Sequence, residues 1–474
     1  MKFGTSGLRG LSEDLKGRAP ALFATAFGRY LLLDSGLAQA GDAILIGPDY
    51  RDSSPEIATN CTDPHVSLGV DVQDCGTAPT PALALYDLQQ KAGCLMVTSS
   101  HIPADRNDVK FHRPTGEIKA DEAAITAAAT ALDGAGFAFA PRGTRTQEDS
   151  SECLTTLRER NAHTLPAGAL AGLKVGVYRH STIARDLLVD LLMHFGATVV
   201  PFGRSETFVP VDTEASCHET IAKLTDAARQ HGLDAIVLAD GDGDRPIVAD
   251  ETGTPLLGDV LGLIAANFLG ATLVVTPVTS NSGIEAADSF SVIRTRVGCP
   301  FVISGMQKAI VSGDHNVAGF QANGGVLTAS GFDINGHTLR ARPTRDCFVP
   351  LLATLFLAAS RRQPVSVISD SWELPFAVAD RFEDFPVETS ARLMAHLRSG
   401  SSNLATLLDP IGKVGSVSDI DGLRLTLGDR RTIHFRPFSN APEIRCNVEA
   451  EGEAAAAALL GFGLQRINCW VETN

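Results

Sequence analysis

The chain has 474 residues, of which 44% are hydrophobic and 20% are charged, and its formal net charge is −15 at pH 7. A chain of this length exceeds what one hydrophobic core can serve, so we expect about three or four globular domains. The acidic balance argues against nucleic-acid binding, and no apolar run approaches the roughly 20 residues of a membrane span.

The cysteines and the first residues bear on the compartment. Nine cysteines are scattered without a Cys-x-x-Cys pair, so neither a zinc site nor a disulfide framework is expected. The opening MKFGTSG lacks the apolar segment of a secretory signal. We therefore predict a cytoplasmic protein. Nothing in the sequence specifies an oligomeric state.

A short apolar strand, a polar loop containing serine and then a helical pattern occur in this order three times. The strands are predicted at 43–47, 173–177 and 272–275. The loops that follow them are 51–55 (RDSSP), 180–182 (HST) and 279–283 (TSNSG). These spacings are too long for solenoid repeats, so they indicate three related α/β domains in tandem.

The tail of the chain has a different pattern. It combines a predicted helix at 389–398, strands at 422–426, 432–435 and 445–449, and a final helix from Glu453. This mixture is typical of an α+β domain. Linkers are expected at 137–153, 253–258 and 361–370. The predicted domains are 1–145, 150–255, 256–368 and 369–474.

The loop 98–103 (TSSHIP) follows the apolar run 93–97 and so lies at the end of a predicted strand. Ser100 beside His101 suggests a nucleophile with a nearby acid or base. Because successive strand residues point to opposite faces, His101 can assist Ser100 only if the loop bends. A structural serine-rich turn is the simpler interpretation of this loop on its own.

Two basic residues lie in other polar segments of the first domain. Lys110 ends the segment 107–110 (NDVK), where burial could lower its pKa. Arg9 lies in a glycine-rich N-terminal loop, 5–10 (TSGLRG). Neither segment is specific by itself.

The segment 240–245 (DGDGDR) follows a predicted buried strand at 233–239. Its carboxylates are Asp240, Asp242 and Asp244. Carboxylates this crowded repel one another unless a cation holds them, and Mg²⁺ or Ca²⁺ suits oxygen ligands. The glycines allow a tight loop, and the C-terminal end of a strand is where α/β sheets place ligands.

A calcium-binding EF-hand is the alternative interpretation of this segment, with Glu251 as its twelfth residue. However, Arg245 stands where that loop needs glycine, and a strand rather than a helix precedes it. The sequence therefore favours Mg²⁺.

Two further loops have polar side chains suited to a sugar phosphate. The loop 319–325 (GFQANGG) offers the amides of Gln321 and Asn323 to hydroxyl groups. The segment 434–442 (HFRPFSNAP) combines Arg436 with hydroxyl and amide donors, which is the composition of a phosphate cradle. Plain turns between strands are the alternative for both.

In this order, the loops resemble those of the α-D-phosphohexomutases, the phosphoglucomutase and phosphomannomutase enzymes, over essentially the whole chain. The resemblance is closest to the bacterial phosphomannomutase/phosphoglucomutase enzymes. It implies three α/β domains and a C-terminal α+β domain around a central cleft. It also implies an isomerase, an intramolecular phosphotransferase that interconverts hexose 6-phosphate and hexose 1-phosphate, with mannose first and glucose second.

The resemblance further implies a phosphoserine, Mg²⁺, and a bisphosphosugar that is both intermediate and activator. The implied catalytic residues are Ser100, Lys110, Arg9 and His101, with Lys110 as the proton-transfer residue. The implied metal ligands are phosphorylated Ser100, Asp240, Asp242 and Asp244. The implied substrate-binding residues are Arg245, Gln321, Asn323, Arg436, Ser439 and Asn440.

The chain departs from the family pattern at four of these loops. Ile102 stands where the family has Asn, Asp108 where it has Gly, Gln321 where it has Glu, and Phe438 where it has Ser. These changes bear on substrate grip, since the nucleophile, metal ligands and Lys110 are intact. Gln321 and Phe438 motivate the alternative of a non-catalytic sugar-phosphate-binding or regulatory protein on this fold. A phosphoglucosamine mutase, and a Mg²⁺ phosphatase that releases phosphate from Ser100 to water, are further alternatives.

Overall fold

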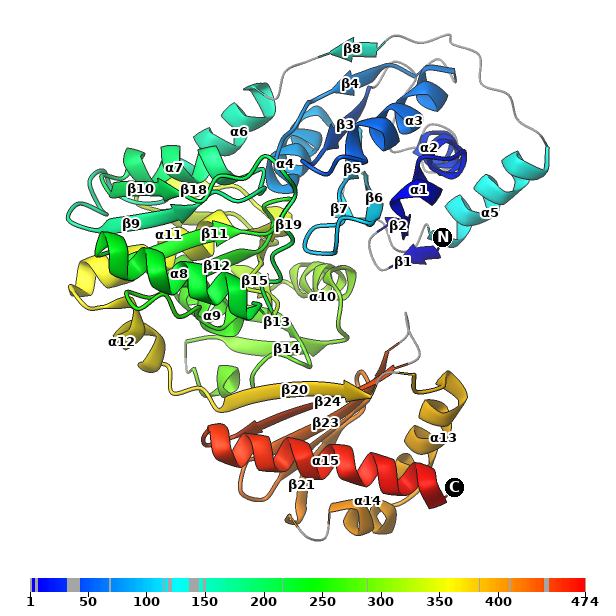
Figure 1. The fold of residues 1–474 in the computed structure, drawn as a ribbon, viewed down its shortest axis with the longest axis vertical. Helices are drawn as coiled ribbons and strands as arrows, with labels where there is room; N and C mark the ends of the chain where they lie inside the picture. The colour runs from blue at the N-terminus through cyan, green and yellow to red at the C-terminus, as the bar shows by residue number, and fades with distance from the viewer. Residues whose placement is uncertain are drawn as a thin grey trace.

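The computed structural model describes residues 2–4, 7–31, 43–67, 70–113, 116–117, 122–135, 145–147, 151–214, 216–287, 289–382, 384–408, 411–438 and 443–473. Within them, four large sheets follow one another along the chain, and a two-stranded sheet accompanies the third (Figure 1). We propose that these four sheets mark four domains with the limits expected from the sequence.

The first sheet has eight strands, in the order β1-β2-β6-β5-β3-β4-β8 with β7 paired to β6. The strands are β1 (Lys2–Gly4), β2 (Gly7–Leu11), β3 (Ile44–Pro48), β4 (Val72–Asp74), β5 (Gly93–Val97), β6 (Arg106–Arg113), β7 (Gly116–Glu117) and β8 (Arg145–Gln147). The helices of this segment are α1 (Ser12–Leu15), α2 (Ala19–Arg29), α3 (Ser54–Ser67), α4 (Thr80–Gln90) and α5 (Glu122–Gly134). The apolar strand β5 is buried along its whole length, as a strand covered on both faces should be.

The second sheet has the order β10-β9-β11-β12. Its strands are β9 (Lys174–Tyr178), β10 (Thr198–Phe202), β11 (Ala235–Ala239) and β12 (Pro246–Ala249). Its helices are α6 (Ser151–Asn161), α7 (Arg185–His194) and α8 (His218–His231).

The third sheet has the order β14-β13-β15-β16-β19. Its strands are β13 (Leu273–Pro277), β14 (Ser291–Thr295), β15 (Val317–Phe320), β16 (Val326–Thr328) and β19 (Arg342–Asp346), and the small sheet pairs β17 (Phe332–Ile334) with β18 (His337–Leu339). The helices are α9 (Gly258–Leu269), the 3-10 helix η2 (Ser282–Ala286), α10 (Cys299–Val311), α11 (Phe348–Arg361) and α12 (Val365–Asp370).

The three sheets share one four-strand order. In β4-β3-β5-β6, β10-β9-β11-β12 and β14-β13-β15-β16, the first strand in sequence pairs in parallel with the second and the third. The fourth strand then returns antiparallel to the third. This common topology confirms the prediction of related α/β domains in tandem.

The last sheet is fully antiparallel, in the order β20-β24-β23-β22-β21, and α15 packs on it (Figure 1). Its strands are β20 (Phe376–Phe382), β21 (Val414–Ser418), β22 (Leu423–Leu427), β23 (Thr432–Phe438) and β24 (Glu443–Ala450), and its helices are α13 (Val387–Arg398), α14 (Ser401–Leu408) and α15 (Glu453–Thr473). The predicted C-terminal α+β part, and with it the fold class, is confirmed.

Three expectations about local structure differ from the fold. The stretch expected as the first linker, 137–153, contains β8, which pairs with β4, and the first residues of α6. The third serine-containing loop leads into the one-turn 3-10 helix η2 rather than an α-helix, and the Asn281 side chain caps it by accepting from the Gly283 N–H at 2.8 Å. The stretch expected as the third linker contains α12, because Val365 and Ile368 are spaced to bury one face of a helical turn.

The hydrophobic core is divided unequally. One buried cluster joins the first two sheets to helices of the third segment, and it includes Leu45 of β3, Val237 of β11 and Phe348 of α11. The last sheet has its own buried cluster, with members between Phe385 and Ile467. Among the described residues, no helix combines the length and apolar character needed to cross a membrane.

Candidate active site

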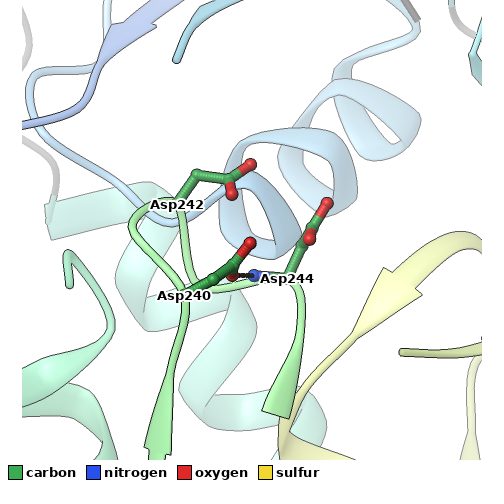
Figure 2. Close-up of side chains that lie close together, drawn as sticks. All are labelled: Asp240, Asp242 and Asp244. Atoms are coloured by element: carbon green, nitrogen blue, oxygen red, sulfur yellow. Dashed lines mark hydrogen bonds between the residues drawn. The ribbon is translucent and has the colours of Figure 1, made fainter. Parts of the chain in front are cut away.

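The aspartate loop is the hairpin between β11 and β12, where Ala239 pairs with Pro246. Figure 2 shows the carboxylates of Asp240, Asp242 and Asp244 turned toward a common space. One oxygen from each lies within 4.8 Å of the others, and all three residues are buried. The loop therefore stands at the C-terminal end of a buried strand, as predicted.

Backbone geometry explains the two glycines of this loop. Gly243 has a φ of +71°, in the left-handed region that favours glycine. At Gly241, an added Cβ would lie 2.5 Å from the carbonyl oxygen of Ser100. The Oδ1 atom of Asp240 accepts the backbone N–H groups of Asp244 and Arg245, both at 3.1 Å, and so closes the turn.

The carboxylate cluster fits a hard cation. The Oδ1 atoms of Asp242 and Asp244 are buried, and neither has a hydrogen-bond partner among the residues that the structure describes. Burial, together with the charges of the two neighbouring aspartates, raises the pKa of Asp240 well above its usual value. Buried acceptors without donors are what an oxygen-ligated cation satisfies. Glu251 does not join them, because its carboxylate accepts from the hydroxyl and backbone N–H of Ser366.

Ser100 faces this cluster. Its hydroxyl donates to Oδ2 of Asp240. Its backbone is left-handed, with a φ of +56°, and its N–H donates to the Thr98 hydroxyl at 3.0 Å. Because the loop bends at Ser100, the Nδ1 atom of His101 lies 3.5 Å from the Ser100 hydroxyl. The bend that the sequence required for these neighbours to meet is present.

Lys110 reaches the same carboxylates from β6. Its Nζ lies 2.6 Å from Oδ2 of Asp242 and 3.7 Å from Oδ2 of Asp244. Burial alone would lower the pKa of Lys110, but the two carboxylates outweigh it and the pKa is raised. The expectation of a lowered pKa is wrong for this arrangement, because the sequence could not show the ion pairs.

His101 and Arg245 form a second pair at the mouth of the cluster. The Arg245 guanidinium donates to Nδ1 of His101 at 2.7 Å. Burial and the Arg245 charge lower the pKa of His101 to about 4. His101 is therefore a neutral imidazole near pH 7, with Nδ1 as an acceptor.

Arg9 lies on β2 opposite Asp108 of β6. Its Nε and Nη2 donate to the Asp108 carboxylate, with the shortest bond at 2.6 Å. Since Asp108 and Lys110 are two apart on one strand, Arg9 is on the same face of the sheet as Lys110. The guanidinium is thus near the cluster but held by Asp108, the residue that stands where the family has glycine.

The loop of Gln321 and Asn323 joins β15 to β16, and both residues are buried. The Asn323 amide donates to Oε1 of Gln321 at 3.2 Å and to Oε1 of Glu214 at 3.4 Å. The two amides therefore contact each other, and Glu214 brings a carboxylate to them from the second segment.

A cavity of about 480 Å³ adjoins this loop and reaches the last sheet. Ala322 and Glu214 line it on one side, and Arg436 lines it from β23. The Arg436 guanidinium donates to Oδ2 of Asp421 at 3.0 Å. Two predicted substrate-binding residues, Ser439 and Asn440, lie outside the described residues.

Three residues that the sequence reasoning did not assign to the site touch it. Arg345 donates twice to Oδ2 of Asp244, at 2.9 and 2.6 Å. The Thr80 hydroxyl donates to Oδ2 of Asp242 at 2.6 Å. Arg51 donates to the Ser100 carbonyl at 3.1 Å. Arg51 lies in one of the serine-containing loops at a strand end, and Arg345 lies in the run 318–351, which contributes to the family resemblance. No sequence pattern pointed to Thr80.

A serine hydroxyl that donates to a buried carboxylate cluster, on a tandem α/β fold, is an arrangement that fits a metal ion beside a nucleophile. Comparison with known proteins makes this specific. Family models described as phosphoglucomutase/phosphomannomutase, alpha/beta/alpha domain I and domain II, match residues 1–134 and 154–253.

Similar proteins extend the match to the whole chain. A phosphomannomutase of Sinorhizobium fredii is 49% identical over 98% of both chains. A phosphomannomutase of Salmonella muenchen is 36% identical over 98% of this chain and 95% of its own. The fold resembles that of a phosphoglucomutase/phosphomannomutase family protein from Burkholderia thailandensis, with a TM-score of 0.75 and 21% identity over 98% and 96% of the chains. The chain belongs to the phosphoglucomutase/phosphomannomutase family, the α-D-phosphohexomutases.

Proposed function

We propose that this protein is a phosphohexomutase that interconverts hexose 6-phosphate and hexose 1-phosphate, with mannose phosphate as first substrate and glucose phosphate as second. The observation that carries the proposal is the hydrogen bond from the Ser100 hydroxyl to Asp240 within the buried carboxylate cluster. It puts a nucleophile where a phosphoryl group and a cation can share one site.

Ser100 is the residue that carries the phosphoryl group, and Asp240, Asp242 and Asp244 hold Mg²⁺ beside it. Charge supports this pairing. Three carboxylates stand beside three cations, of which Lys110 and Arg345 make close ion pairs and Arg245 lies 3.6 Å from Asp244. Mg²⁺ brings two positive charges, and a phosphoserine brings about −1.5 to −2, so the two together keep the balance. When bound, Mg²⁺ supplies electrostatic stabilisation of the transferring phosphoryl group.

In the transfer, a sugar hydroxyl attacks the phosphorus, gives up its proton, and the Ser100 oxygen leaves and regains one. Lys110 is the proton-transfer residue. Lys110, held by Asp242 at 2.6 Å, would give a proton to the leaving Ser100 oxygen and take the proton of the attacking hydroxyl, so its charge is the same before and after the transfer. Arg245, His101 and Arg9 line the reacting phosphate, where the guanidinium groups bind its oxygens.

The other end of the substrate is bound across the cavity. Gln321 and Asn323 read sugar hydroxyls through their amides, and Arg436, with Ser439 and Asn440, clamps the phosphate that does not react. A two-ended site suits a bisphosphosugar that turns over and returns its other phosphate to Ser100. The same compound serves as activator by loading Ser100. The nine cysteines, scattered along the chain without a Cys-x-x-Cys pair, favour a cytoplasmic setting for this reaction.

A coupled assay tests the proposal. Purified protein, Mg²⁺ and a trace of hexose 1,6-bisphosphate are supplied with mannose, glucose or glucosamine 1-phosphate, and 6-phosphate formation is followed. We expect the highest kcat/KM with mannose 1-phosphate and a mass gain of one phosphate that is lost in Ser100→Ala. Preference for glucosamine 1-phosphate would move the enzyme to the phosphoglucosamine mutase alternative. No turnover of any sugar would leave a non-catalytic binding protein.

A further inference from the structure

Arg51 is a fully buried arginine whose guanidinium binds one loop. It lies in the turn after β3, and its side chain has an exposed fraction of 0%. Nη1 donates to the carbonyls of Pro103 and Arg106, at 2.8 and 3.0 Å. Nη2 donates to those of Ser100 and Ile102, at 3.1 and 2.5 Å. A buried charge is strongly destabilising without such partners, so the guanidinium keeps the loop in the conformation that supplies these carbonyls.

Asp49 binds Thr98, at the start of the same loop. Its Oδ2 lies 3.3 Å from Nε of Arg51 and accepts the Thr98 hydroxyl at 2.7 Å. The same Thr98 hydroxyl receives the N–H of Ser100. Asp49 and Arg51 therefore fix both sides of Ser100, whose left-handed backbone is unfavourable for a residue with a Cβ.

Arg51 also joins the loop to the second segment. Its guanidinium carbon lies 3.9 Å from the ring centroid of Phe208, which belongs to the connection between β10 and α8. Phe208 and the Ser100 carbonyl are the two groups nearest to an added Cβ on Gly241. The Ser100 loop, Phe208 and the aspartate loop thus pack against one another. Arg51 contacts both Phe208 and the Ser100 loop.

We propose that Arg51 is the positioning residue for Ser100. It does not touch substrate. Its planar fork holds the carbonyls of the 100–106 segment so that the Ser100 hydroxyl faces Asp240, and its contact with Phe208 sets the distance between the two loops. The proposal rests on the proposed role of Ser100 as phosphoryl carrier.

Arg51→Lys is the direct test, because lysine keeps the charge but cannot span four carbonyls. Misplacing a nucleophile by about 1 Å can cost about a hundredfold in rate. We therefore expect kcat with mannose 1-phosphate to fall about a hundredfold while KM stays within about twofold. Loading of Ser100 by hexose 1,6-bisphosphate, followed by intact mass, should slow in parallel.

Arg466→Lys is the matched control. Arg466 also donates to backbone carbonyls, those of Leu407 and Thr406 at the end of α14, at 3.1 and 2.8 Å, and lies over a phenylalanine, but it belongs to the last domain. Its kcat should be unchanged. An equal loss of kcat in both variants, or none in Arg51→Lys, would overturn the proposal.

Thr98→Val is the second variant, used if Arg51→Lys does not fold. It removes the hydroxyl that links Ser100 to Asp49 and leaves the shape nearly the same. A fall in kcat with an unchanged KM supports the positioning role, and wild-type kcat contradicts it. Failure of the proposed function would look different, because the unmodified protein would then neither turn over sugar phosphate nor take up phosphate on Ser100.

Discussion

Each aspartate of the cluster has a different cationic neighbour, so the pKa of each carboxyl is shifted differently. Burial alone would raise the pKa of both Asp242 and Asp244. Lys110 and its hydrogen bond lower the pKa of Asp242 strongly, and Arg345 lowers that of Asp244. Within the described part of the chain, no cation lies comparably close to Asp240, since Arg245 is 3.8 Å away, and the pKa of Asp240 is raised instead. Asp240 is therefore the aspartate whose ionised form is most disfavoured by burial and by the neighbouring carboxylates.

Asp240→Asn should separate catalysis from stability. The amide keeps the shape and relieves the repulsion, so the free energy of unfolding should not fall. It removes a negative ligand, so kcat should drop about a hundredfold or more, and more Mg²⁺ should be needed for half-maximal rate. Asp87→Asn is the control, because Asp87 is also a buried carboxylate with a raised pKa but lies away from the cluster. An Asp240→Asn enzyme with wild-type kcat would contradict the metal assignment.

The Arg9–Asp108 pair should limit the affinity for sugar phosphate. A phosphate must compete with the Asp108 carboxylate for the Arg9 guanidinium, which holds it at 2.6 Å. Arg9 is partly exposed, so the pair is worth no more than about 1 kcal/mol. We expect Asp108→Asn to lower KM about two- to fivefold, measured by initial rates at fixed ionic strength.

Asp105→Asn is the control for Asp108→Asn, because it removes the same charge from the exposed start of the same segment. If both variants lower KM equally, the effect belongs to net charge and not to the release of Arg9.

At the scale of elements, the three predicted loops occupy one topological position. The loop of Ser100 joins β5 to β6, the aspartate loop joins β11 to β12, and the loop of Gln321 joins β15 to β16. Each is the connection from the third to the fourth strand of the shared order. A repeated fold thus places nucleophile, metal ligands and amides at equivalent ends of three sheets.

Much of this was predictable from the chain itself, because apolar runs and polar loop residues are local. The strands β3, β9 and β13 were each predicted within about one residue of their observed starts. The order of strands, the pairing of Lys110 with Asp242 and that of Arg345 with Asp244 were not predictable. Each of these pairs joins residues more than a hundred positions apart, and no local pattern records such a distance. The helix α12 was missed because its polar surroundings are typical of a linker.

Gly241→Ala should push two of these loops apart. An added Cβ would meet the Ser100 carbonyl at 2.5 Å and the Phe208 ring at 3.0 Å. Overpacking of this kind costs about 1–3 kcal/mol, which thermal unfolding would report as a lower Tm. Because the strain falls on the Ser100 loop, kcat should drop at least about tenfold. Gly461→Ala, in α15 with open space around it, should leave kcat unchanged. A fall in Tm with wild-type kcat would show that the loops move without losing their alignment.

At the scale of the whole molecule, the last sheet is attached differently from the others. Its buried cluster is its own, while another cluster joins the first two sheets to helices of the third segment. Polar contacts connect the strands β22 and β24 to the third segment of the chain. Arg424 donates to the Val278 carbonyl at 2.7 Å, and Glu449 pairs with Arg424 at 3.1 Å and accepts the Ser282 N–H. Separate cores joined by polar contacts favour motion of the last sheet as a unit.

Arg424→Met should therefore loosen one part of the molecule and not the rest. It leaves the Glu449 carboxylate, 7% exposed, without its guanidinium, and breaking a buried pair costs about 3–5 kcal/mol. By calorimetry we expect a transition of the last domain to move to lower temperature while that of the first three sheets stays. Since Arg424 and Arg436 line the same cavity, KM should rise more than kcat falls. Arg398→Met, which removes a bond to the Gly422 carbonyl within the last domain, controls for local damage. A single transition that shifts as a whole would mean that the four sheets unfold together and that the polar contacts act as part of one core.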